Sequence, residues 1–384
     1  MAGIIAGTDA PQASSDMAPE KARRRARFHR LTVREVRPLT DDSIEVTFAI
    51  PPELAGEYDY DPGQYVAIRA MIDGAELRRS YSICAVPTPG EIRIAIKRDL
   101  GGAFSTWALA NLAPGHELDV MSPEGTFTTD IRPDAVKHYV AIAAGSGVTP
   151  VIALASSVLE QSPGSQFTIV YSNRTALDTM FLEDLADLKD RYPARLALHH
   201  VLTRETRTSP LLSGRIDHEK LEKILGLLVR PENVDEWFIC GPFELVQLCR
   251  DTLADHGVAA TDIHFELFTT GEPGRPEGSH GRPVDVDPGG AVHSITFTLD
   301  GRASTVTTPV HGRESVLNAA LRVRPDVPFA CAGGVCGTCR AKLVAGTVDM
   351  QENFALEPEE LDRGYVLTCQ SLPTSEAVSV DYDV

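Results

Sequence analysis

The sequence is short of positive charge and of cysteine. Only 36 Lys and Arg stand against 54 Asp and Glu in 384 residues, a formal net charge of −18. Phosphate contacts need clustered Lys and Arg, so this charge argues against nucleic acid as a partner. Seven cysteines are too few for a disulfide scaffold, and their odd number leaves at least one unpaired. We therefore expect a cytoplasmic protein in which any cysteine cluster binds metal.

Long uninterrupted apolar segments are also missing. Residues 139–158 carry no charged side chain, but Gly145, Gly147 and Pro150 break the stretch. A membrane-spanning helix tolerates such residues poorly, so we expect a strand, a tight turn and a helix here, and no membrane partner. Residues 1–26 are rich in small, polar and basic residues without the apolar run of a secretory signal, and we expect them to be disordered.

The periodicity changes along the chain, which predicts three folded modules. Residues 27–133 hold short β-type runs broken by Gly and Pro, as in an antiparallel β-barrel. Residues 134–268 alternate apolar strands with helical stretches, which indicates an α/β domain with a parallel sheet. Residues 269–290 contain six Gly and four Pro and are predicted to be a flexible linker. Residues 291–384 form the third block, with four of the seven cysteines.

Those four cysteines follow a C-x4-C-x2-C pattern, with the fourth after a longer gap. The candidate ligands are Cys331, Cys336, Cys339 and Cys369. This is the plant-type ligand spacing of a 2Fe-2S cluster, and Gly333, Gly334 and Gly337 let the loop wrap a cluster closely. Zinc and a structural disulfide are the alternatives. Zinc is disfavoured because only one C-x2-C arm is present.

From Val292 to Val384 the block resembles a plant-type ferredoxin, which implies a β-grasp fold of the α+β class. Residues 331–384 carry nine acidic and three basic side chains. This charge fits either a solvated face or a docking surface for a basic electron acceptor, and the sequence favours neither.

A short motif in the barrel region is Arg79-Ser80-Tyr81-Ser82. It resembles the R-x-Y-S motif of the ferredoxin–NADP reductase superfamily. The resemblance implies that Arg79 neutralises a flavin phosphate, Tyr81 packs on the isoalloxazine ring and Ser82 approaches the reactive nitrogen. It also favours FAD over FMN, which the residues alone do not decide.

A second motif, G-G-A-F-S at residues 101–105, follows Lys97. It resembles the superfamily's pyrophosphate turn, where the amides at a helix N-terminus bind anions. The resemblance implies that Lys97, Gly102 and Ser105 contact the flavin cofactor.

A glycine loop, G-S-G-V-T-P at residues 145–150, follows the first strand of the α/β region. It starts like a dinucleotide fingerprint, but a proline stands where a Rossmann motif has its third glycine. The form G-S-G-x-T-P resembles the NAD(P)-binding loop of the same superfamily. The implied coenzyme contacts are Gly145, Ser146, Gly147, Thr149 and Pro150.

Ser172 and Arg174 stand at the end of the second strand of this region, where NAD-specific folds often carry an acidic residue. A hydroxyl and an Arg there suit the 2′-phosphate of NADPH, so we favour NADPH over NADH. A solvated loop Arg is the alternative.

Cys240-Gly241-Pro242 ends the fourth strand of the α/β region and resembles the superfamily's C-G-P motif. The resemblance implies that Cys240 lies beside the nicotinamide, and no His/Asp relay accompanies it as a nucleophile would require. It also implies that Glu266 and Phe268 lie near the flavin and nicotinamide rings, although a plain role in the last strand is equally open. Ser82 and Cys240 are the residues that we expect nearest to the chemistry.

From Phe28 to Val384 the chain resembles the reductase components of multicomponent oxygenases with a C-terminal ferredoxin domain. The stretches 76–84, 214–217, 331–336 and 365–370 are similar to the group that serves phenylacetyl-CoA epoxidases in phenylacetate catabolism. The resemblance implies electron transfer from NAD(P)H through FAD and the 2Fe-2S cluster to a separate, multisubunit di-iron oxygenase.

The sequence contains no two-His-one-carboxylate set and no paired E-x-x-H helices, so we expect the partner to carry out oxygen activation. One alternative is a reductase for another oxygenase, such as a Rieske-type 3-ketosteroid 9α-hydroxylase. A second alternative is a non-enzymatic redox sensor, against which the presence of Ser82, Cys240 and the four cluster cysteines argues.

Overall fold

The computed structural model describes residues 4–6, 27–99, 101–267, 290–329, 332–356 and 358–384. The chain divides into two compact units. The first unit comprises Phe28–Ile72 and Ser80–Thr269, and the second comprises Met1–Arg27, Asp73–Arg79 and Thr270–Val384.

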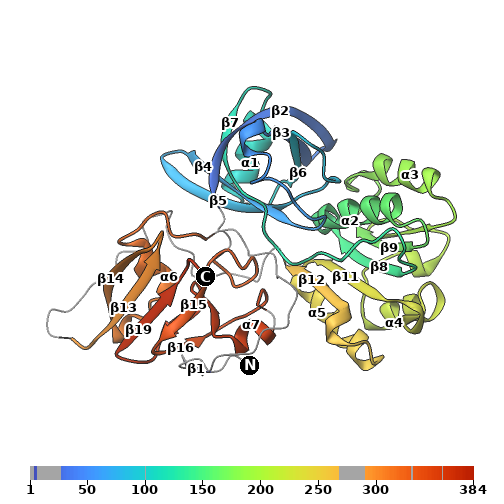
Figure 1. Cartoon of the computed structure of the whole chain (residues 1–384). Helices are drawn as coiled ribbons and strands as arrows, with labels where there is room; N and C mark the ends of the chain where they lie inside the picture. The colour runs from blue at the N-terminus through green and yellow to red at the C-terminus, as the bar shows by residue number, and fades with distance from the viewer. Residues whose placement is uncertain (1–3, 7–26, 100, 268–289, 330–331, 357) are drawn as a thin grey trace. The chain divides into compact units, whose positions relative to one another are not determined.

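An antiparallel sheet with the strand order β5-β4-β7-β2-β3-β6 forms the predicted barrel (Figure 1). Its strands are β2 (Phe28–Thr40), β3 (Ser43–Ala49), β4 (Tyr65–Ile72), β5 (Ala75–Ser82), β6 (Glu91–Lys97) and β7 (Glu117–Met121). A bridge between Ile83 and Ile94 joins the chain after β5 to β6, so the sheet closes on itself. Alternate residues such as Val46 and Phe48 are fully buried inside it. Helix α1 (Ala103–Asn111) follows β6.

A parallel sheet with the order β10-β9-β8-β11-β12 forms the rest of the first unit, as the alternating pattern predicts. Its strands are β8 (His138–Ala144), β9 (Gln166–Asn173), β10 (Leu196–Leu202), β11 (Glu236–Gly241) and β12 (Ile263–Leu267). Helices α2 (Val148–Gln161) and α3 (Leu182–Arg191) cover one face, and α4 (His218–Leu227) and α5 (Phe243–Asp255) cover the other (Figure 1). The strand order reverses at β8, and ligands bind parallel sheets at the carboxyl ends of the strands beside such a reversal.

The C-terminal module of the second unit has a mixed sheet with the order β14-β13-β19-β15-β17. Its strands are β13 (Val292–Leu299), β14 (Arg302–Pro309), β15 (Arg340–Ala345), β17 (Tyr365–Leu367) and β19 (Ala377–Asp381). Helix α6 (Val316–Leu321) begins at the N-cap Ser315, and all six of its residues are buried. A short helix, α7 (Pro358–Asp362), precedes β17. One helix buried against a mixed sheet is the predicted α+β arrangement.

The expectation of disorder over residues 1–26 is wrong for three residues. Ile4–Ala6 form β1, which pairs with β16 (Thr347–Met350) in a small sheet completed by β18 (Ser371–Pro373). Two consecutive isoleucines favour a strand, and the open edge of β16 offers unpaired backbone groups. The other residues of that range lie outside the described part of the chain, as do residues 269–289 of the predicted linker.

Candidate functional site

Three predicted residues meet where β5, β11 and β12 end. Ser82 is the last residue of β5, and its hydroxyl donates to Glu266 Oε2 at 3.0 Å. Cys240 and Glu266 are paired neighbours on the parallel strands β11 and β12. The fold therefore gathers residues as far as 184 positions apart in sequence. Phe268, the fourth residue expected here, lies outside the described residues.

The thiol of Cys240 is suited to stay protonated. It is fully buried, and burial together with the charge of Glu266 raises its pKa well above the usual range. A thiol with a raised pKa is a poor nucleophile. Cys84 and Cys249 are also buried, and burial raises the pKa of Cys249 to about 12.

The two flavin motifs of the barrel meet through aromatic rings. The ring centroids of Tyr81 on β5 and Phe104 in the first turn of α1 are 5.7 Å apart. The guanidinium of Arg79 donates to the carbonyl oxygen of Arg78 at 2.7 Å. Tyr81 therefore lies next to the predicted pyrophosphate turn.

The turn before α1 requires a glycine at its cap. Gly102 is the N-cap of α1, and no side chain caps the first turn, which leaves its amides suited to an anion. A Cβ at Gly102 would lie 2.7 Å from Ser105 Oγ and 2.9 Å from Asp99 Cβ. Ser105 is buried, and its hydroxyl accepts from the Asp99 amide at 3.0 Å. In this structure Ser105 therefore braces the turn.

The predicted coenzyme loop touches the C-G-P segment through its backbone. A Cβ at Gly147 would lie 2.2 Å from the carbonyl oxygen of Cys240 and 2.9 Å from the amide nitrogen of Gly241. Gly241 itself has a φ of +159°, close to extended backbone, and its Cβ would lie 3.2 Å from Ala144 Cβ. Only glycine at position 147 permits this approach, so the two loops meet where β8 and β11 end.

Tyr171 holds the start of the same loop. Its buried hydroxyl donates to the carbonyl oxygen of Gly145 at 2.9 Å. Thr149 Oγ1 donates to the carbonyl oxygen of Ser146 at 2.9 Å, and Pro150 lies in the first turn of α2, where its missing amide costs no helical hydrogen bond. Sequence reasoning missed Tyr171 because, within an apolar strand, it resembles an ordinary core residue.

Arg174 and Lys97 are both engaged by carboxylates. Arg174 forms ion pairs with Asp42 and Asp178, and Lys97 forms one with Asp42. Ser172 is buried on β9. No sequence signal pointed to Asp42, because it lies 132 positions from Arg174.

The structure brings two of the cluster cysteines to the core of the C-terminal module. Cys339 is buried there, and Cys369 is partly buried against the same core. The Thr368 hydroxyl donates to the carbonyl oxygen of Cys339 at 2.8 Å and accepts from Tyr382 at 3.0 Å. These bonds join the two distant cysteine segments.

The loop that carries Cys336 is tightly curved. Ala332, Gly334 and Gly337 have φ values of +54°, +77° and +67°, and a Cβ at Gly334 would lie 3.1 Å from the Glu352 carbonyl oxygen. This curvature fits a loop that wraps a cluster. Cys331 lies outside the described residues, and within those that are described no three His, Cys, Asp or Glu side chains converge to hold a metal ion.

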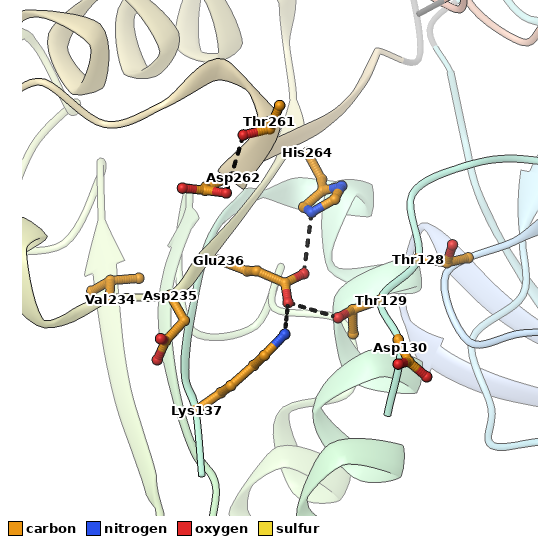
Figure 2. Close-up of a pocket in the computed structure, with 10 residues that line it drawn as sticks. All are labelled: Thr128, Thr129, Asp130, Lys137, Val234, Asp235, Glu236, Thr261, Asp262 and His264. Carbon is orange, nitrogen blue, oxygen red and sulfur yellow. Dashed lines mark hydrogen bonds and ion pairs between the residues drawn. The ribbon is translucent and has the colours of Figure 1, made fainter. Parts of the chain in front are cut away.

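A separate pocket of about 640 Å³ lies beside the starts of β11 and β12, at the opposite edge of the parallel sheet (Figure 2). Glu236 accepts hydrogen bonds from Lys137 Nζ at 2.6 Å and Thr129 Oγ1 at 2.9 Å, and its other oxygen lies 3.2 Å from His264 Nε2. Burial alone raises the pKa of Glu236, but the hydrogen bonds from His264, Lys137 and Thr129 lower it to about 2. We interpret this network as structural, because it is remote from the ends of β8 and β11.

The fold and the site define a class: an oxidoreductase built from a flavin-binding barrel, a nicotinamide-binding α/β domain and a 2Fe-2S module. Three family models match it. They are the oxidoreductase FAD-binding domain over residues 30–129, the oxidoreductase NAD-binding domain over 141–251 and the 2Fe-2S iron-sulfur cluster binding domain over 297–374. In the described part of the chain, no helix is long and apolar enough to cross a membrane.

Two curated relatives extend over nearly the whole chain. One, a component of the 1,2-phenylacetyl-CoA epoxidase from Escherichia coli K12, is 44% identical over 93% of this chain and 98% of its own length. The ferredoxin reductase component of 3-ketosteroid-9-alpha-monooxygenase from Mycobacterium tuberculosis H37Rv is 34% identical over 92% of this chain and 95% of its own length. The chain therefore belongs to the ferredoxin reductase-like family of oxygenase reductase components with a 2Fe-2S domain.

Solved structures share the fold. Phthalate dioxygenase reductase covers 92% of this chain and 98% of its own chain, with a TM-score of 0.55 at 21% identity. An intact type IV self-sufficient cytochrome P450 monooxygenase covers 92% of this chain and 41% of its own, with a TM-score of 0.65 at 23% identity. This chain is an NAD(P)H oxidoreductase that passes electrons to an oxygenase.

Proposed function

We propose that this protein is the reductase of a multisubunit di-iron oxygenase that epoxidises phenylacetyl-CoA, and that it takes its electrons from NADPH. The observation that carries the proposal is the 44% identity to the Escherichia coli epoxidase component over 98% of that protein. The presence of all three matched domains in one chain supports it.

The residues of the two flavin motifs and of the glycine loop fit the two cofactors that the family uses. Arg79, Tyr81 and the uncapped first turn of α1 would hold FAD, and the loop at residues 145–150 would hold the nicotinamide coenzyme. When bound, FAD would supply the exchange between two-electron transfer from the coenzyme and one-electron transfer to a 2Fe-2S cluster. Gly147 lets the coenzyme loop lie against Cys240, so a coenzyme bound to this loop would lie beside the end of β11.

The Ser82–Glu266 hydrogen bond would serve this reaction in two ways. Ser82 would present a small hydroxyl at the end of β5, and Glu266 would orient it by accepting its hydrogen bond, which leaves the Ser82 oxygen free to accept a hydrogen bond. Because Cys240 is buried and protonated, it adds a neutral, polarisable group that excludes water. In the second unit, Cys336, Cys339 and Cys369, together with Cys331, would hold the cluster.

Reconstitution with purified oxygenases tests the proposal. The holoenzyme, with both cofactors confirmed by absorption, is mixed with phenylacetyl-CoA epoxidase and its substrate, and NADPH consumption is compared with product formed. We expect a ratio near one. A ratio far above one with the epoxidase, together with tight coupling to another oxygenase, would contradict the proposal.

The second candidate partner is a 3-ketosteroid 9α-hydroxylase. The observation that favours it is the 34% identity to the mycobacterial reductase over 95% of that protein. The same assay with this hydroxylase and its steroid decides between the two, because only the physiological partner couples coenzyme use to product.

A further inference from the structure

Four charged side chains form a compact cluster within the first unit. Asp42 lies in the turn between β2 and β3, Lys97 ends β6, and Arg174 and Asp178 follow β9. Arg174 Nη2 lies 3.0 Å from Asp42 Oδ2 and 2.7 Å from Asp178 Oδ1. Lys97 Nζ lies 3.1 Å from Asp42 Oδ1. Two cations and two anions cancel, so the cluster has no net charge to offer a ligand.

Both carboxylates are held in place and ionised. Thr40 Oγ1 donates to Asp42 Oδ1 at 2.8 Å, and Thr175 Oγ1 donates to Asp178 Oδ2 at 2.7 Å. Burial alone raises the pKa of Asp42, but hydrogen bonds from Thr40 and Lys97 and the charges of Lys97 and Arg174 lower it overall. The hydrogen bond from Thr175 and the charge of Arg174 lower the pKa of Asp178 despite partial burial. One guanidinium nitrogen of Arg174, Nη2, therefore contacts both ionised carboxylates at neutral pH.

We propose that Asp42 and Asp178 set the coenzyme selectivity of this reductase by competing with the 2′-phosphate of NADPH for Arg174. The inference rests on the proposed use of NADPH. A phosphate seeks the same guanidinium donors as a carboxylate, so at Nη2 of Arg174 it must displace one of the two. At the other nitrogens it meets a guanidinium whose positive charge the two carboxylates already offset. NADH has no such phosphate and leaves the cluster intact. The preference for NADPH over NADH is thus smaller than it would be if Arg174 had no carboxylate partners.

Asp42 is expected to have the larger effect. Asp42 forms ion pairs with both Arg174 and Lys97, so neutralising it releases two cations, whereas the ion pair of Asp178 is with Arg174, four residues earlier. Asp42 also belongs to the barrel, while Arg174 belongs to the nucleotide-binding domain. A residue of the flavin module therefore limits which coenzyme the other module prefers.

The test uses Asp42→Asn in the full-length holoenzyme, because asparagine keeps the size of the side chain and its bond to Thr40. Asp41→Asn is the matched control: Asp41 is exposed, it has no ion pair within the described residues, and its loss changes the net charge equally. Calorimetric titration with 2′,5′-ADP and with 5′-AMP measures affinity with and without the 2′-phosphate, independently of turnover.

We expect Asp42→Asn to tighten 2′,5′-ADP binding about three- to fivefold, the size of one partly exposed ion pair, and to leave 5′-AMP binding within about twofold. Asp41→Asn should change both ligands alike. If Asp42→Asn matches Asp41→Asn, the competition does not occur and the inference fails.

Arg174→Ala separates this inference from the proposed coenzyme. If Arg174→Ala weakens 2′,5′-ADP selectively while Asp42→Asn has no effect, only the competition is overturned. If Arg174→Ala affects both ligands equally, the proposed NADPH preference fails, and the inference fails with it. If Asp42→Asn loses its flavin, Asp178→Asn replaces it in the test. Asp178→Asn must also tighten the binding of 2′,5′-ADP for the inference to stand.

Discussion

Replacing Gly147 with alanine tests whether the backbone contact between two loops builds the coenzyme site. The added Cβ would lie 2.2 Å from the carbonyl oxygen of Cys240, whereas ordinary contact begins at 3.4 Å. The coenzyme loop and the end of β11 must then separate by about 1 Å, and overpacking of this kind costs about 1–3 kcal/mol of stability. Gly147 has a φ of −62°, so the cost comes from the contact and not from backbone conformation.

A displacement of about 1 Å at a reacting centre can lower the rate about 100-fold. We therefore expect kcat/KM for NADPH-dependent ferricyanide reduction to fall about 10- to 100-fold in Gly147→Ala. Flavin content and the thermal unfolding temperature, measured on the same samples, separate a displaced loop from a misfolded protein.

Gly145→Ala is the matched control, because no atom lies within 4 Å of its added Cβ. Its φ of +55° makes alanine cost about 1–2 kcal/mol through conformation alone. We expect its kcat/KM to fall less than about fivefold. Equal losses in the two variants would refute the argument that the contact with Cys240 sets the site.

Three other predictions concern the cluster, a buried carboxylate and a loop brace. Cys339→Ser should abolish the cluster absorption and oxygenase-coupled turnover but leave ferricyanide reduction intact, and normal oxygenase turnover would contradict the linear path. Glu236 has a lowered pKa, so its stabilisation is complete above about pH 4.5 and is lost as the pH falls toward 2. In urea unfolding, Glu236→Gln should lower the free energy of unfolding by about 2–3 kcal/mol at pH 7 and by less at pH 3. The same decrease at both pH values would contradict the assignment. Tyr171→Phe removes the hydrogen bond to the Gly145 carbonyl oxygen. The Kd for NADPH should rise about fivefold, which corresponds to one hydrogen bond of about 1 kcal/mol. An unchanged Kd would show that this hydrogen bond does not position the coenzyme loop.

Local pattern was enough to predict most of the architecture. Gly and Pro turns predicted the antiparallel strands, and alternating apolar strands and helices predicted the parallel sheet, because both patterns reflect which faces are buried. Local sequence motifs also identified the segments of Gly147 and Cys240, and the backbones of these two segments are in close contact. The strand Ile4–Ala6 was missed because its stability depends on pairing with β16.

Contacts between distant segments were not predictable from one sequence. Nothing near Arg174 shows that Asp42 neutralises it, since the pair forms only when the turn after β2 meets the loop after β9. Glu236 looks like an ordinary first residue of a strand, yet three donors surround it. Such effects depend on geometry that composition and spacing do not encode.

The described cysteines differ in their accessibility to a thiol reagent in solution. Cys84, Cys240 and Cys249 are buried with thiols held protonated, so a disulfide reagent reacts with them only when the fold opens. Cys336 and Cys369 are partly exposed in the C-terminal module. In native protein, the fast phase of a thiol titration therefore reports Cys336 and Cys369 of the C-terminal module. A slow second phase reports the opening of the fold around the buried thiols, which include Cys339 of the same module.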